Sequence, residues 1–345
     1  MEKKDNRLND WVIKKIEDEF SNDVCLLLAH NRLKLGKDMD KASFSYYIPA
    51  TNRANGLART FIVDGVGYDL FPIPWKRVED MADIKKCYST TVLDNAEILW
   101  ARSEEDKQRF ISLQDRLRAN FKNPYYMREK AKEWFCWAKD VFQDAFFEDE
   151  LYKVRKYAGQ ICDLLSIVVA YANMRYLKHG ETKQIQEISE MNKIPKNFVE
   201  LYQNIITEQL PNVQKRLCYD LITSTKAFLE EREETDSSKG MVDFEELAFW
   251  YQELSYWWRR VYYWCDENNF INAYLRGCML QEEVDENGKK FGITDIDIMS
   301  SFDANDLTLL RKRAEAVEQN FRRAIEENGV KIDEYKTIED FLETN

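Results

Sequence analysis

Residues 24–49, which read VCLLLAHNRLKLGKDMDKASFSYYIP, decide the fold that the sequence predicts. The stretch opens with a continuous apolar run at residues 24–29, a pattern typical of a buried strand. A polar and basic segment follows, and residues 43–48 are then rich in aromatic side chains up to Pro49. Aromatic residues bounded by a proline indicate a second strand. We therefore expect two strands joined by a polar loop.

The residues on either side extend this pattern into a small αβ domain. Upstream, apolar residues recur at the spacing of a helix between residues 8 and 20. Downstream, residues 61–73, FIVDGVGYDLFPI, place Asp64-Gly65 between two apolar runs. An Asp-Gly pair in that position predicts a hairpin, because both turn residues need positive φ. A short helix after Pro74 and a last strand at residues 96–100 complete the predicted domain.

From Ser103 onward the sequence predicts helices. Ser103 followed by Asp106 has the signature of a helix N-cap, and the chain holds only 11 glycines and 6 prolines, which favours long helices. The acidic stretch at residues 230–240 is interpreted as an exposed loop between helices rather than a domain linker. After a first helix that ends before Asn123-Pro124, the expected helices cover about residues 125–147, 149–178, 196–209, 213–232, 243–284 and 303–328.

These elements predict an α+β fold with two domains. A chain of 345 residues exceeds the usual span of one compact core, and its 44% of apolar residues excludes wholesale disorder. We place a small mixed αβ domain at residues 1–102 and a larger, bundle-like helical domain at residues 103–345. A substrate is then expected between the two domains.

Composition excludes several classes of function. The formal net charge of −12 opposes binding to nucleic acid or to an anionic membrane. The seven cysteines contain no C-x-x-C pair and the chain has two histidines, so neither a zinc knuckle nor a His-rich metal site is indicated. The most apolar run, residues 164–172, is too short to span a bilayer, and residues 1–10 show no signal-peptide pattern. We expect a cytoplasmic protein; the sequence does not indicate its oligomeric state.

Two carboxylates stand before the second predicted strand. Asp38 and Asp40 would lie on one face of an extended chain, because side chains i and i+2 point the same way. Such a pair can hold Mg²⁺, which takes one or two carboxylates together with phosphate oxygens and water. A third carboxylate is expected from a neighbouring strand, and Asp69 is the candidate. The alternative is that all three acids face solvent at strand ends.

The order of these motifs resembles the nucleotidyltransferase superfamily, which is polymerase-β-like, and within it the aminoglycoside and lincosamide nucleotidyltransferase type. The resemblance rests on the strand VCLLLA, the D-x-D in KDMDKASFSYYIP, the aspartate in GYDLF and the helix-rich remainder. It implies Mg²⁺-dependent transfer of a nucleoside monophosphate from a nucleoside triphosphate to a hydroxyl of a small, antibiotic-like acceptor. It also implies that Asp38 and Asp40 share two magnesium ions and that Asp69 binds the catalytic one near the acceptor hydroxyl.

One motif departs from the superfamily pattern. A Gly-Ser pair after the first strand holds the triphosphate in that superfamily, and His30-Asn31 stands here instead. Asn31, Lys34 and Lys37 are candidates for a rebuilt phosphate site, and a solvated basic loop is the alternative. The departure keeps a second function open, in which a catalytically degenerate protein of this fold binds a ligand or another protein.

The helical region contributes two more candidates. Related antibiotic nucleotidyltransferases draw a carboxylate from their helical domain, so the resemblance suggests Glu148 as general base for the acceptor hydroxyl. Arg155, one or two turns further on, would then meet a phosphate. The alternative for Glu148 is electrostatic, since acids suit the start of a helix.

A run of aromatic residues at 249–264 suggests a place for the acceptor. Trp250, Leu254, Trp257 and Val261 form a buried stripe at helical spacing. The remaining aromatic residues, with Arg259 and Arg260, are candidates for stacking on the acceptor.

Overall fold

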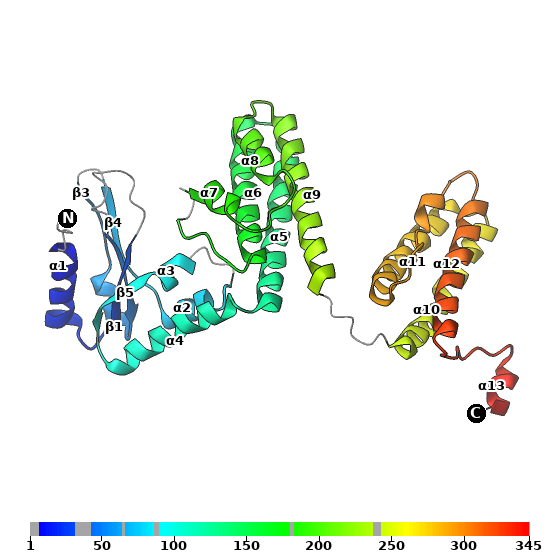
Figure 1. Cartoon of the computed structure of the whole chain (residues 1–345), viewed down its shortest axis with the longest axis horizontal. Helices are drawn as coiled ribbons and strands as arrows, with labels where there is room; N and C mark the ends of the chain where they lie inside the picture. Colours follow the sequence, from blue (N-terminus) through cyan, green and yellow to red (C-terminus); the bar gives the residue numbers. More distant parts are fainter. Residues whose placement is uncertain are drawn as a thin grey trace. The chain divides into compact units, whose positions relative to one another are not determined.

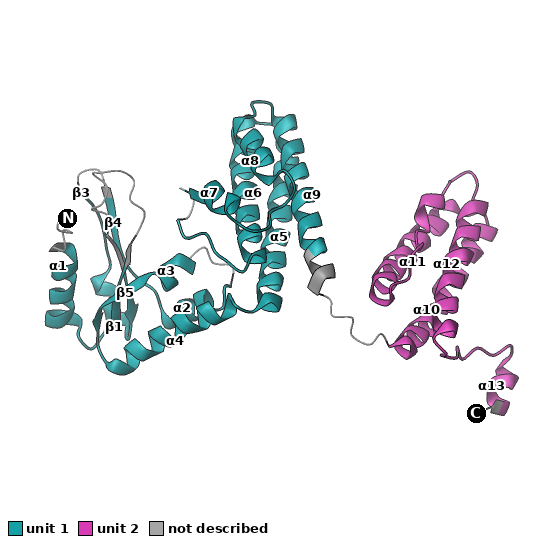
Figure 2. Ribbon diagram, viewed as in Figure 1, with its two compact units in different colours: residues 1–236 teal, residues 237–345 magenta. Residues whose placement is uncertain are grey.

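A computed structural model shows the chain as two compact units, Met1–Asp236 and Ser237–Asn345 (Figure 2). The structure describes residues 7–31, 43–63, 66–85, 90–179, 183–236 and 243–344. In these ranges no helix combines the length and the apolar character needed to cross a membrane.

The first unit begins with helix α1 (Arg7–Lys15), a π-helical turn at Ile16–Phe20 and a five-stranded mixed sheet (Figure 1). The strand order is β3-β4-β2-β1-β5, in which β2 and β4 run parallel and the other neighbours run antiparallel. The predicted strands and the α+β class are confirmed. The turn residues Asp64-Gly65 lie outside the described residues. The strands are β1 (Val24–Asn31), β2 (Ser43–Pro49), β3 (Arg59–Val63), β4 (Val66–Pro72) and β5 (Ala96–Ala101).

Both faces of the sheet are covered because its strands are apolar on both sides. Tyr47 and Leu70 pack in a small core with α1, whereas Tyr46 and Ile48 belong to the larger core on the other face. Helices α2 (Trp75–Ala82) and α3 (Thr90–Asp94) lie between β4 and β5 in the chain, and α2 contributes to the larger core. The alternation along β2 therefore assigns each side chain to one face.

The helices that follow share this larger core with the sheet. Leu26 and Tyr46 of the sheet belong to the same cluster of buried residues as Trp134, Leu165 and Leu229. In order, the helices are α4 (Glu104–Asn120), α5 (Pro124–Phe146), α6 (Leu151–Ala172), α7 (Gln184–Ser189), α8 (Phe198–Thr207) and α9 (Pro211–Asp236). The predicted N-cap is present, since the Ser103 hydroxyl accepts a hydrogen bond from the Asp106 amide at 3.1 Å.

The second unit has a core of its own, built from α10 (Phe244–Asp266), α11 (Phe270–Phe291) and α12 (Thr308–Glu327). A 3-10 turn at Met299–Ser301 and a short helix α13 (Ile338–Thr344) complete it. Residues 243–284, expected as one helix, divide at Asn268, which has φ +52°, and the Asn269 side chain caps α11.

The compact units do not follow the predicted domains 1–102 and 103–345. No division falls near Ser103, because the sheet and the following helices share one core. The division follows Asp236 instead, so the helical residues after 103 belong to two units. Residues 230–236 of the acidic stretch, expected as a loop, form the last turns of α9.

One buried carboxylate organises the second unit. Glu318 is 3% exposed and accepts hydrogen bonds from the hydroxyls of Tyr251 (2.8 Å) and Tyr262 (2.6 Å) and from Arg259 (2.6 Å). Burial, and then the hydrogen bond from its hydroxyl to Glu318, raise the pKa of Tyr251 to about 12. The three donors tie α10 to α12.

We predict that Glu318→Ala destabilises the second unit by about 1–3 kcal/mol, because it leaves two buried hydroxyls without their acceptor. Hydrogen exchange of the α10 and α12 amides in the full chain measures the effect. Glu315→Gln, at a half-exposed position on the same helix, is the control. Unchanged exchange in Glu318→Ala would show that this network does not stabilise the unit.

Candidate functional site

The parallel pair of strands places Asp69 beside the strand that follows the D-x-D motif. Ser45 is level with Leu70 and Tyr46 with Phe71, so Asp69, one residue earlier, is level with Phe44. The strand that carries Asp69 is thus the direct neighbour of β2. Asp40 precedes the first residue of β2 by three positions in the sequence.

Asp69 is partly exposed, and one of its carboxylate oxygens accepts a hydrogen bond from the neighbouring strand β3. Its Oδ1 accepts a hydrogen bond of 2.9 Å from the Thr60 hydroxyl, on the residue paired with it in β3. Leu70 is buried and Phe71 packs against the larger core, so both anchor the strand as expected. A Cβ at Gly67 would meet no atom within 4 Å, so the space beside that residue is open.

The other predicted members of this site fall outside the described residues or at their edge. Asp38, Asp40, Lys34 and Lys37 lie outside the described residues. Asn31 is the last residue of β1, paired with Ser43, and only its backbone is described.

The described residues offer magnesium a single predicted ligand. Asp69 supplies carboxylate oxygens, which Mg²⁺ prefers. In β2, Phe44 is level with Asp69, and its neighbours in the strand are Ser43 and Ser45. None of these three residues carries a carboxylate. Within the described ranges, no three His, Cys, Asp or Glu side chains come together as a possible metal site. A three-carboxylate site therefore depends on Asp38 and Asp40.

The structure does not bring Glu148 or Arg155 to Asp69. Glu148 follows α5, a helix of 23 residues and therefore about 34 Å long, at the end away from α4. Its carboxylate pairs with Lys153 at 3.2 Å. Arg155 donates a hydrogen bond of 2.7 Å to Gln209, in the connection between α8 and α9. Both side chains therefore link elements at one end of the helical bundle.

The aromatic run belongs to the second unit and is mostly structural. Leu254 and Val261 are buried, and Trp250 and Trp257 pack against the same core, as expected for the predicted stripe. Of the two arginines, Arg259 pairs with Glu318, and Arg260 lies over the Tyr256 ring with 4.5 Å to its centroid. The exposed aromatic residues on this helix are Phe249, Tyr256 and Tyr263.

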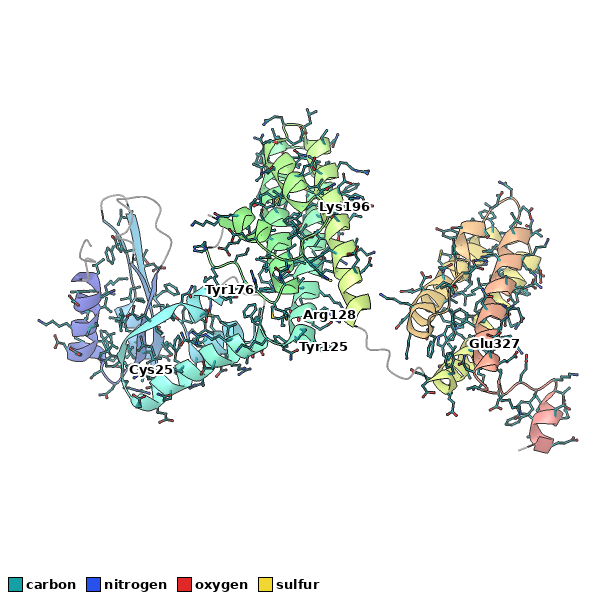
Figure 3. All side chains as sticks on the ribbon, viewed as in Figure 1. Cys25, Tyr125, Arg128, Tyr176, Lys196 and Glu327 are labelled. Carbon is teal, nitrogen blue, oxygen red and sulfur yellow. The ribbon has the colours of Figure 1, made fainter. Side chains whose placement is uncertain are left out.

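Sequence reasoning missed a contact that holds three segments of the first unit together. Tyr176, which is labelled in Figure 3, lies in the segment after α6. Its hydroxyl donates a hydrogen bond to Asp94 at the end of α3. Arg118 of α4 donates to the other oxygen of the same carboxylate at 2.8 Å. No short motif signals this contact, because its residues are common types from three distant parts of the chain.

No protein-family model matches the chain, and no curated protein matches it. A crystal structure of a nucleotidyltransferase-like protein from Exiguobacterium sibiricum is similar over 65% of this chain and 75% of that chain. The identity is 12% and the TM-score is 0.42, values that assign neither a fold family nor a function.

We predict that Tyr176→Phe lowers the free energy of unfolding by about 1.5–3 kcal/mol, the range for hydrogen bonds to charged groups. Urea unfolding measures the change, and Tyr125→Phe, whose residue is 71% exposed, is the control. Equal effects of the two variants would contradict the assigned hydrogen bond.

The same pair of proteins gives a pH test. Burial, and then the hydrogen bond to Asp94, raise the pKa of Tyr176. A raised folded-state pKa contributes stability that is complete below the unfolded-state value of about 10 and is lost as the pH rises above it. The stability difference between wild type and Tyr176→Phe should therefore shrink above about pH 10.

Proposed function

We propose that the protein is a magnesium-dependent nucleotidyltransferase that moves a nucleoside monophosphate from a nucleoside triphosphate to a hydroxyl of a small, antibiotic-like acceptor. One observation supports this proposal: the parallel pairing of β2 with β4, which puts Asp69 next to the strand that follows Asp38 and Asp40. Asp69 lies on β4, and Asp38 and Asp40 lie in the segment that precedes β2 in the sequence. Three carboxylates are a donor set suited to Mg²⁺.

In this proposal each residue has a distinct task. Asp38 and Asp40 would hold the magnesium ions, which neutralise phosphate charge when bound. Asp69, whose Oδ1 is oriented by Thr60, would join them near the acceptor hydroxyl. Asn31, Lys34 and Lys37 would bind the triphosphate, the lysines as point charges. The oxygen of the acceptor would bond to the α-phosphorus as the bond to pyrophosphate breaks.

Glu148 and Arg155 receive no role in this proposal. Their side chains are engaged with Lys153 and Gln209, at the end of α5 and α6 away from α4. The group that removes the hydroxyl proton is therefore sought among the residues around β2 and β4.

A second candidate is a catalytically degenerate protein of this type that binds a ligand or another protein. A specific observation favours it: the positions of β2 level with Asp69 and on either side of it are Ser43, Phe44 and Ser45, without a carboxylate. The His30-Asn31 pair in place of Gly-Ser points the same way.

We predict that a nucleoside triphosphate and Mg²⁺ together raise the melting temperature of the wild type, and that Asp69→Asn removes the shift. A ligand that binds only the native state at 100 times its Kd stabilises it by about 2.7 kcal/mol. Thermal melts with each of the four nucleotides, with and without Mg²⁺, measure the effect. Glu97→Gln, an exposed acid on β5 of the same sheet, is the control and should keep the shift.

Pyrophosphate release separates the two candidates. A magnesium-dependent shift with release in the presence of hydroxyl acceptors supports transfer, and a shift without release supports the binding protein. If no nucleotide shifts the melting temperature, or if Asp69→Asn responds like the wild type, the transferase proposal fails.

A further inference from the structure

A pocket of about 620 Å³ lies on the first unit between α3, the end of α4 and the segments around α7. The donation of Tyr176 and Arg118 to Asp94 holds these segments together. Asp94 lies two residues before β5, which is an edge strand of the sheet, and the strand β4, which carries Asp69, is three strands away. Three strand spacings are about 14 Å, so this pocket is separate from the Asp69 region.

The floor of the pocket is apolar and aromatic. Leu117 and Met191 are buried, and the rings of Phe121 and Tyr176 lie with centroids 5.3 Å apart. Ring faces and thioethers make favourable contacts with flat apolar groups. A volume of this size is in the range that small-molecule sites have.

Met174 brings one more apolar side chain to this pocket at a conformational cost. The residue has φ +55°, a left-handed conformation that glycine adopts most easily after a helix. The Arg175 amide donates to the Ala170 carbonyl at 2.9 Å, which closes the end of α6. Such costs are often retained at functional sites. Here the strained position holds a side chain that is 45% exposed and lines the pocket.

The acids of this pocket already have internal donors. Both oxygens of Asp94 are engaged, by Arg118 and Tyr176. Glu187 accepts from the amides of Lys178 (2.7 Å) and His179 (2.8 Å) and contacts the His179 ring at 2.5 Å. The remaining acid, Glu190, accepts from Gln186 at 3.2 Å.

Of the basic side chains that line the pocket, Arg118 is paired with Asp94 and the His179 ring contacts Glu187, whereas the other three have no acidic partner among the described residues. The basic rim, which we define as Lys122, Arg175 and Lys178, is exposed. In the described part of the chain, no acid forms an ion pair with these three side chains. The rim lies near the ends of α4 and α6, and each helix end contributes about half a negative charge. With Arg118 offset by Asp94, the three rim cations exceed Glu187 and Glu190 by one charge, so the lining is close to neutral once the helix ends are counted. What the rim offers a bound molecule is unused N–H donors rather than a strong positive field.

We propose that this pocket binds a small molecule in which a flat aromatic body carries a phosphate group. The aromatic body lies on the floor of Phe121, Tyr176 and Met174. The phosphate oxygens accept hydrogen bonds from the basic rim, where an arginine can bind two oxygens at once. This site is independent of the proposed transfer at Asp69.

Three probes test which chemical features the pocket recognises. Calorimetry of the full chain with 1-naphthyl phosphate, 1-naphthol and inorganic phosphate compares the complete ligand with each of its halves. We expect 1-naphthyl phosphate to bind at least tenfold more tightly than either half. Binding of 1-naphthol that equals that of 1-naphthyl phosphate, or no binding of 1-naphthyl phosphate at millimolar concentration, would overturn the proposal.

Two sets of variants locate the binding. Arg175→Gln combined with Lys178→Gln should weaken 1-naphthyl phosphate binding at least tenfold. Lys196→Gln combined with Lys226→Gln removes the same charge from exposed positions elsewhere on the unit and should leave binding unchanged. Equal losses in both pairs would mean that the probe senses only overall charge, and the proposal would fail.

Met174→Gly tests the floor without threatening the fold, because glycine suits the left-handed conformation. We expect an unchanged or higher melting temperature and severalfold weaker binding of 1-naphthyl phosphate. Unchanged binding would contradict the proposed floor. Asp69→Asn should bind this probe like the wild type, so that failure of the transferase proposal and failure of this one are distinguishable.

Discussion

One continuous hydrophobic core joins the sheet of the first unit to its helices, and the arrangement of both depends on it. Tyr46 of β2, Phe110 of α4, Trp134 of α5 and Leu165 of α6 all belong to it and are at most 1% exposed. Burial of each large apolar side chain contributes about 1.5–3 kcal/mol, so neither the sheet nor the helices would keep this arrangement alone. The same packing fixes α3 and α4 against the end of α6, where the pocket forms.

Local patterns in the sequence were sufficient for the strands and for most helices, but not for every helix boundary or for how the elements are grouped. The strands were predictable because apolar runs bounded by Pro49 and by Asp64-Gly65 are short-range signals. The division after Asp236 was not, because it depends on which distant residues share a core. The acidic residues before it were expected in a loop, yet glutamate and arginine are good helix formers, and α9 continues through them.

For the candidate site too, local patterns predicted the residues on one strand or segment but not which distant residues lie close to them. That Asp69 lies on a neighbour of the D-x-D strand followed from motif order, and the parallel register now gives its level as that of Phe44. Glu148 and Arg155 were placed near a cleft because of the resemblance to antibiotic nucleotidyltransferases, which draw a carboxylate from their helical domain. Their distance from the sheet follows from the length and direction of α5, which carries the chain to the end of the helical bundle away from α4. The contact of Tyr176 with Asp94 spans 82 positions, beyond any local pattern.

Exposed lysines and arginines are common near helix ends, where they favour the negative end of the helix dipole, so the basic rim alone would indicate no ligand. What distinguishes this rim is that two acids beside it, Asp94 and Glu187, already accept hydrogen bonds from other residues of the protein. In a chain with a net charge of −12, acids to pair with surface cations are abundant. Yet Asp94 and Glu187, which line the same pocket, are turned to Tyr176, Arg118 and the turn at His179. Internal donors therefore satisfy Asp94 and Glu187, and the N–H donors of the basic rim stay open to an outside acceptor.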